Sequence, residues 1–357
     1  MCRTVIRLAS VVIAIGLSTT AGYGQLLGVY EFDGGGDGSS WDDAANWEQV
    51  LDPFGNPISG NPATPPGPTT SAELPLPGVV IDNTMPGQTA LDARIGTTAG
   101  VGSLNMSGGG LTVRDFNIGA DSAGANAGSF TLSDGTLTAG DDISVGAGSV
   151  GTMTMSGGTA SVNDDFNINA NSTLTLTGGT IEIGDRLVMR TNGHLLIEGG
   201  EIIAEDDFFI LDNATVTMEG GLMSTVDKLN MGNATPMGPA RLVINDGIMR
   251  SNEWTDDSEL EFNDPTRFMS VIEINGSGKL QVEQATFPRS EANFLIAEGV
   301  HLTTTEPGGL GVQTVIVPEF FGRTDVVFTQ VSVIPEPASL VLLGLGALCL
   351  VVRRTRA

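Results

Sequence analysis

The chain has 357 residues and a formal net charge of −26, with 16% charged residues, 5% aromatic residues and 49 glycines. An acidic protein of this kind repels phosphate backbones, which excludes nucleic acid as a partner. A composition rich in Gly, Thr, Ser and Asn with scattered aliphatic residues favours an extracellular β-solenoid and fits a helical enzyme poorly.

Residues 1–24 have the organisation of a secretory signal peptide. Arg3 and Arg7 precede an apolar run, Leu8–Leu17, and small residues follow it. Cleavage after Ala21 or after Gly24 fits the pattern equally well. Cys2 lies in this segment and Cys349 near the other end, so the body has no disulfide and no cysteine-based metal site. We therefore expect an exported body that is stabilised by packing alone.

Residues 25–100 differ from the rest of the chain in being rich in turn residues. A solenoid needs its first coil covered, and we expect this region to be an N-terminal cap with Trp41 and Trp47 packed on that coil. Val79–Ile81 is a short expected strand. The alternative is a sugar-stacking or calcium-binding module, although Asp33 and Asp37 lack the spacing of an EF-hand loop.

Residues 101–283 repeat with a period close to 21. The repeat is anchored by a glycine at a corner that requires a positive φ. The anchors are Gly109, Gly135, Gly158, Gly179, Gly200, Gly221 and Gly247. Within a repeat, apolar residues form three pairs, each spaced by two, as in Met153/Met155, Ala160/Val162 and Phe166/Ile168. This spacing predicts three short strands per repeat, with the paired side chains inward.

The predicted fold class is therefore all-β, a single-stranded parallel β-helix (β-solenoid) with coils of about 21 residues. Precedent favours a right-handed helix. Seven or eight coils stacked ~4.8 Å apart predict a rod of roughly 35–40 Å. Weaker repeats occupy residues 241–283, interrupted by an acidic stretch, Ser251–Arg267. Residues 284–332 are expected to form the last coils and a C-terminal cap.

Acidic residues precede the third strand of most repeats and form the most specific internal pattern. Two residues before the first inward side chain stand Arg114, Asp141, Asp164, Asp185, Asp206 and Asp227, and one residue before it stand Asp115, Asp142, Asp165, Arg186, Asp207 and Lys228. Stacked coils turn these positions into two ladders. One interpretation is that each Asp caps its own turn by accepting backbone N–H groups. The other is a Ca²⁺ site, with Asp141, Asp142, Asp164, Asp165, Asp206 and Asp207 as candidate ligands.

Catalysis is the alternative from another class, because paired carboxylates can act as acid and base in polysaccharide lyases and glycoside hydrolases. A catalytic pair should interrupt the repeat, whereas these acids are the repeat. Arg186, Arg190 and His194 on one coil are the basic residues that could assist them. We expect no catalytic residues and no cofactor other than the candidate Ca²⁺.

The last 25 residues combine three features in a fixed order. Pro335-Glu336-Pro337 is followed by the uncharged apolar run Ala338–Val352 and then by Arg353, Arg354 and Arg356. The apolar run has 15 residues, below the ~17–25 of a full transmembrane helix, and the arginines favour the cytoplasmic side. We expect a short membrane anchor at 338–352 with the body outside.

This tail resembles the PEP-CTERM sorting signal. The resemblance covers residues 333–357 and implies that an exosortase, a membrane cysteine protease, recognises Pro335-Glu336-Pro337 and removes the tail. It implies an address and a processing event without implying a biochemical activity.

The sequence therefore predicts a non-catalytic structural or adhesive protein of the cell surface or extracellular matrix. Its precursor is membrane-anchored, and extracellular polysaccharide is a candidate partner.

Overall fold

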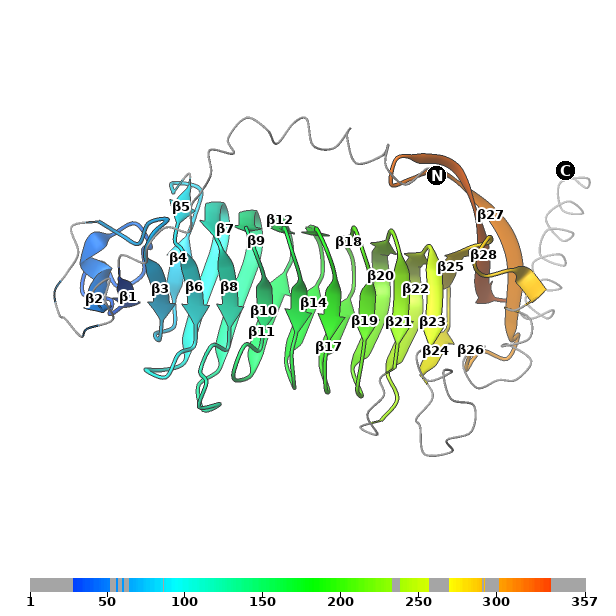
Figure 1. Ribbon diagram of the computed structural model, residues 1–357, viewed down its shortest axis with the longest axis horizontal. Helices are drawn as coiled ribbons and strands as arrows, with labels where there is room; N and C mark the ends of the chain where they lie inside the picture. Colours follow the sequence, from blue (N-terminus) through cyan, green and yellow to red (C-terminus); the bar gives the residue numbers. More distant parts are fainter. Residues whose placement is uncertain are drawn as a thin grey trace, which may run out of the picture.

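The computed structural model describes residues 28–51, 56, 60, 64–85, 87–232, 238–256, 270–290, 292 and 302–334. These residues form a β-solenoid of about eight coils, as the repeat predicted. The coils stack side by side along the long axis of the molecule (Figure 1). The handedness of the solenoid stays a prediction from precedent.

Each regular coil contributes one strand to each of three stacks. The first stack holds β4 (Val79–Ile81), β7 (Gly102–Val113), β9 (Gly128–Ala139), β11 (Gly151–Met155), β14 (Thr173–Leu176), β17 (His194–Ile197), β20 (Thr215–Thr225), β22 (Arg241–Ser251), β24 (Val271–Ile274) and β26 (Leu302–Thr303). The second stack holds β5 (Gln88–Thr89), β12 (Thr159–Val162), β15 (Thr180–Ile183), β18 (Glu201–Ala204) and β25 (Lys279–Glu283), together with the second halves of β7, β9, β20 and β22, which continue through the corner.

The third stack forms a separate sheet. It holds β3 (Ser71–Leu74), β6 (Asp92–Ile95), β8 (Asp115–Ile118), β10 (Ile143–Val145), β13 (Phe166–Ile168), β16 (Leu187–Met189), β19 (Phe208–Ile210), β21 (Lys228–Met231) and β23 (Glu253–Asp256). Pairing is parallel with equivalent residues in register: Phe166 pairs with Leu187, which pairs with Phe208. The apolar pairs therefore stack on themselves inside the rod and form one continuous buried core, which confirms the three-strand repeat.

The glycine corners show why the repeat tolerates no side chain there. Gly179 has φ +88°, and a Cβ atom on it would lie 2.7 Å from the carbonyl oxygen of Gly158 in the preceding coil. The positive φ and the close approach of two backbones both require glycine.

The solenoid begins earlier than the sequence analysis placed it. Strands β4, β5 and β6, which pair in parallel with β7 and β8, form a coil within residues 25–100. The cap itself is the antiparallel pair of β1 (Val29–Phe32) and β2 (Trp47–Leu51), joined by residues 33–46, which end in the 3-10 turn Ala44–Asn46. Strand β1 also pairs with β3 and so extends the third sheet. An irregular, proline-rich connection concealed this coil from the repeat pattern.

Trp41 and Trp47 are fully buried at this N-terminal end, with ring centroids 5.0 Å apart, as the cap interpretation required. The carboxylate of Asp37 accepts the N–H groups of Ser39 and Ser40, so it caps a turn. The alternative of a sugar-stacking module built on these tryptophans is wrong, because neither ring is accessible.

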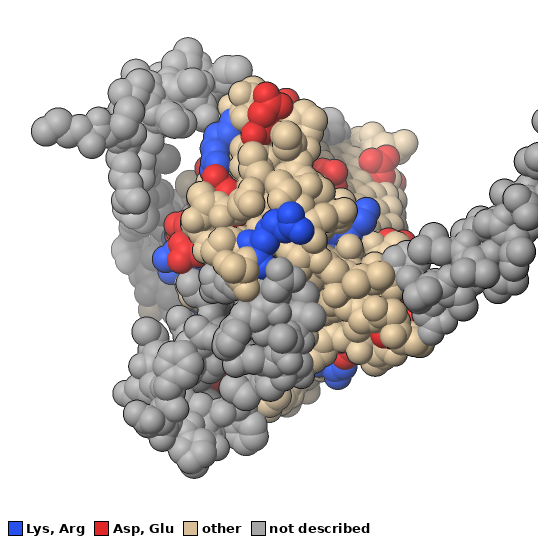
Figure 2. Space-filling model, turned by 90° about the vertical axis from the view of Figure 1, so that its right-hand side faces the viewer, with Lys and Arg blue, Asp and Glu red and all other residues tan. Residues whose placement is uncertain are grey.

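At the other end the stack is closed by a long antiparallel hairpin, β27 (Leu310–Phe320) and β28 (Arg323–Val333). Its strand β28 pairs antiparallel with β25, which ends the parallel stacking. Viewed from this end, acidic and basic side chains are scattered and most of the visible described surface is neither (Figure 2).

The acidic stretch Ser251–Arg267 is only in part an insertion. Its residues Glu253–Asp256 form β23, which pairs in parallel with β21. The expected signal peptide at 1–24 and the expected membrane helix at 338–352 lie outside the described residues. Within the part of the chain that the structure describes, no helix is long and apolar enough to cross a membrane.

Candidate functional site

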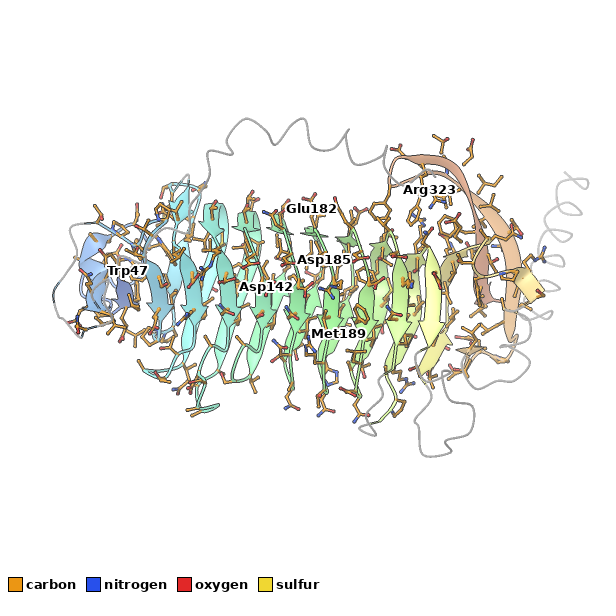
Figure 3. All side chains as sticks on the ribbon, viewed as in Figure 1. Trp47, Asp142, Glu182, Asp185, Met189 and Arg323 are labelled. Atoms are coloured by element: carbon orange, nitrogen blue, oxygen red, sulfur yellow. The ribbon has the colours of Figure 1, made fainter. Side chains whose placement is uncertain are left out.

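The stacked acids line the corner between the second and third strands of the coils. We call the row formed by Asp141, Asp142, Asp164, Asp165, Asp185, Asp206, Asp207 and Asp227 the acidic edge. The parallel register that stacks the core residues also stacks the residues just before them. Figure 3 shows Asp142 and Asp185, two coils apart, on the same side of the rod.

The structure brings the carboxylates of the acidic edge into three groups, each with its oxygen atoms within 4.8 Å of one another. The groups are Asp141–Asp142–Asp164, Asp164–Asp165–Asp185 and Asp206–Asp207–Asp227. All six candidate ligands that the sequence indicated belong to a group. The added members, Asp185 and Asp227, occupy the same ladder.

Burial and neighbouring charges raise the pKa of four carboxyl groups of the acidic edge. Partial burial, a hydrogen bond with Asp185 and the charges of Asp207, Asp185 and Asp227 raise the pKa of Asp206 to about 6. Burial is also the first cause of the raised pKa values of Asp142, Asp164 and Asp207. A row of like charges therefore stores repulsion at neutral pH that protons or cations would relieve.

Hydrogen bonds between coils hold part of the edge in place. The Asp142 carboxylate accepts the N–H of Asp165 at 3.2 Å, and the Asp207 carboxylate accepts the N–H of Lys228 at 2.9 Å. Both donors belong to the next coil. The expectation that each Asp caps its own turn is therefore wrong for these two, because the parallel stacking presents the neighbouring coil's N–H to the carboxylate.

One arginine neutralises the middle of the acidic edge. The guanidinium of Arg186 lies 3.2 Å from the Asp165 carboxylate and 3.3 Å from that of Asp185. The charge of Asp165 is the first cause of the raised pKa of Arg186. Arg186 is one of the three basic residues that were expected to assist the acids, and it reaches Asp165 on the preceding coil.

The edge continues toward the N-terminus, where the sequence analysis did not follow it. Asp92 pairs with Asp115 in register, is 4% exposed, and forms an ion pair with Arg114 at 2.8 Å. Burial is the first cause of the raised pKa of Asp92, and the charge of Arg114 opposes it. The signal was present, since Asp92 directly precedes Ala93 and Ile95, an apolar pair spaced by two.

The basic residues proposed to assist catalysis do not converge. Arg186 precedes β16, Arg190 follows that strand, and His194 begins β17 with an exposed side chain. They occupy three different positions around the coil. The structure therefore gives the lyase interpretation no cluster of acids and bases at this coil beyond the ion pairs of Arg186.

The geometry fits both interpretations of the acidic edge, the acceptance of backbone N–H groups and the binding of Ca²⁺. Three carboxylates with oxygens this close are the ligand type that Ca²⁺ takes. The same carboxylates also have partners in Arg186 and in the N–H groups of neighbouring coils. Calcium at the acidic edge stays a prediction.

Fold and site together define a repetitive β-solenoid protein whose acidic edge is part of the repeat. The chain carries a PEP-CTERM protein-sorting motif: the family model of that motif matches residues 333–356. The motif implies an exported protein, anchored in the membrane as a precursor and processed by an exosortase. The comparisons with curated proteins and with solved structures give no match.

Proposed function

We propose that the mature protein is a non-catalytic structural or adhesive solenoid of the cell surface or extracellular matrix. The observation that carries the proposal is that the acids are members of the repeat. Asp142 and Asp207, three coils apart, make the same contact with the coil that follows. Equivalent contacts between successive coils fit a structural role, whereas catalysis requires one site that differs from its neighbours.

The composition supports the same role. Residues 25–335 hold 41 acidic and 11 basic residues, a formal charge of −30, which keeps an exported rod soluble and apart from its copies. The core is continuous from the N-terminal cap to the last coils, so each coil is stabilised by its neighbours and the rod needs no disulfide.

We propose further that the tail is temporary. A run of 15 apolar residues holds the precursor while Pro335-Glu336-Pro337 is processed, and the mature protein lacks the residues beyond about 337. The body is then free to take its place outside the cell.

The alternative is a β-helical polysaccharide lyase or glycoside hydrolase acting on extracellular polysaccharide. Two carboxylates at a fixed separation would serve such an enzyme. The acidic edge offers similar pairs in several coils. Arg186 distinguishes one place along it, where it forms ion pairs with Asp165 and Asp185.

The two functions separate in one assay. The full-length protein in mild detergent is incubated with neutral and acidic polysaccharides, and both new reducing or unsaturated ends and retention on the polysaccharide are measured. The structural proposal predicts no new ends. Turnover of a polysaccharide that is lost when carboxylates of the acidic edge are replaced would overturn the structural proposal.

A further inference from the structure

The C-terminal hairpin reaches back over the outer face of the second stack. Only residues Phe328–Ser332 of β28 pair with β25. The rest of the hairpin is paired within itself and is not part of the last coil. In Figure 1 it arches over the upper side of the coils. The Arg323–Glu283 ion pair at 2.6 Å fixes the hairpin beside its tip, and a hydrogen bond between the Gln281 and Gln330 side chains at 2.8 Å fixes its base.

An arginine of the solenoid face anchors the hairpin more deeply. The guanidinium of Arg250 lies 5.7 Å from the ring centroid of Phe320 and 5.8 Å from that of Phe328. Burial lowers the pKa of Arg250, and its Nε donates to Gln281 at 2.9 Å. Cation–π attraction of this kind strengthens when the cation is withdrawn from water. These contacts hold the hairpin turn, Phe321-Gly322, at a fixed position over the second stack.

Between the tip and the face lies a groove of about 420 Å³. Its floor is formed by the outward side chains of three successive coils, Ser161, Glu182 and Ile203, which pair in register. Asn163 and Glu205 stand at the corner beside them, and Phe321 of the hairpin tip forms the opposite wall. Figure 3 shows Glu182 on the same side of the rod as Arg323 of the hairpin.

Phe321 holds a backbone conformation that its side chain disfavours. It has φ +48° and Gly322 has φ +72°, the two-residue loop that normally selects Asn, Asp or Gly. In the left-handed region the Cβ atom of a bulky residue crowds the following carbonyl oxygen, and such strain gathers at ligand sites. The ring packs edge-on against Phe320, with centroids 4.8 Å apart, yet stays 36% exposed at the groove. The loop thus carries an aromatic residue at a position where a small polar residue would adopt the backbone conformation more easily.

The lining indicates the chemistry of the ligand. Glu182, Glu205, Asn163 and Ser161 bring hydrogen-bond acceptors, and none of the described residues that line the groove is basic, so the lining favours a ligand rich in donors. Ile203 and the Phe321 ring offer apolar surfaces for a flat, partly apolar unit. The strongly acidic body repels anionic chains. A pyranose ring, with hydroxyl donors at its rim and C–H groups on its face, meets these requirements.

We propose that this groove binds a segment of neutral polysaccharide, held between Phe321 and the Ser161–Glu182–Ile203 floor. The proposal rests on the proposed function, since it names the partner of the surface solenoid. It also places the aromatic sugar-binding surface over the middle coils of the rod, away from the buried tryptophans of the N-terminal cap.

The test is affinity electrophoresis of the full-length protein, in mild detergent, through gels containing soluble β-glucan, mannan or, as the acidic control, alginate. Phe321→Asn removes the ring and suits the left-handed loop, so it should fold at least as well as the wild type. We expect it to weaken binding to a neutral polysaccharide at least about tenfold while the melting temperature is unchanged or higher. Phe321→Tyr, which keeps a ring, should retain binding. Glu182→Gln, which removes a carboxylate of the groove floor, should weaken binding, whereas its matched control Glu198→Gln, at an exposed carboxylate of another corner, should not.

Equal retention of the wild type and Phe321→Asn would overturn the groove and leave the structural function standing. A wild type that moves freely through every neutral gel, or that is retained by alginate, would overturn the groove as well. Turnover of the polysaccharide would instead overturn the non-catalytic function.

Discussion

Replacing one carboxylate of the acidic edge should stabilise the protein at neutral pH. The pKa of Asp206 is raised from 3.8 to about 6 by burial first, then by its hydrogen bond with Asp185 and by the neighbouring charges. Between these two pKa values the folded protein binds more protons than the unfolded chain. The free energy of unfolding therefore rises as the pH falls from 7 through 6 toward 4.

The size of the effect follows from the same pKa. A rise from 3.8 to about 6 corresponds to about 3 kcal/mol if it is unscreened, at 1.36 kcal/mol per pKa unit. Because the Asp206 side chain is partly open to solvent, we reduce this to about 1 kcal/mol. Asp206→Asn should thus raise the melting temperature at pH 7 by about 2 °C and weaken its dependence on pH.

The assay is thermal unfolding followed by circular dichroism at pH 7, 6 and 5 in the presence of EDTA. The wild type should melt higher at pH 5 than at pH 7, since Asp142, Asp164 and Asp207 change in the same direction. Glu198→Gln removes an exposed charge elsewhere and serves as the control. A wild type that loses stability between pH 7 and pH 5, or an Asp206→Asn variant that melts lower than the wild type at pH 7, would refute the reasoning.

Three further predictions concern the repeat and its ions. Gly179→Ala should lower stability by about 2–4 kcal/mol, because it combines a left-handed φ with a 2.7 Å contact to Gly158, whereas Gly140→Ala, whose nearest contact is 3.6 Å, should change it little. Phe166→Ala should cost about 3–5 kcal/mol by opening a cavity in the core, against a small effect for the outward Asn167→Ala, both measured by chemical denaturation. If hydrogen bonds and ion pairs hold the acidic edge, the melting temperature should be the same in EDTA and in about 1 mM Ca²⁺; a clear rise in Ca²⁺ would establish the calcium site instead.

The solenoid was predictable because the interactions that form each coil involve residues close in sequence and recur in every repeat. Apolar residues spaced by two, as in Phe166 and Ile168, reveal which side chains point inward, and a glycine at each corner reveals a conformation that other residues avoid. Once the coils are aligned on these residues, the same register brings Asp142 next to Asp165, because Ile143 pairs with Phe166.

The parts that escaped prediction depend on contacts between distant segments or on degenerate repeats. Strand β23 carries Glu253-Trp254-Thr255-Asp256, without the aliphatic pair, so only its pairing with β21 identifies it. The groove depends on the hairpin turning back over coils that lie far earlier in the chain. No local sequence pattern predicts that Phe321 and Glu182 line the same groove.

Intact mass spectrometry of the protein recovered from cells and from the surrounding medium tests the central claim most directly. We expect the surface or extracellular fraction to hold a species that begins after the signal peptide, near residue 22 or 25, and ends near Pro337, without the apolar run and its arginines. A surface or extracellular protein that still ends in Arg353-Arg354-Thr355-Arg356-Ala357 would contradict it.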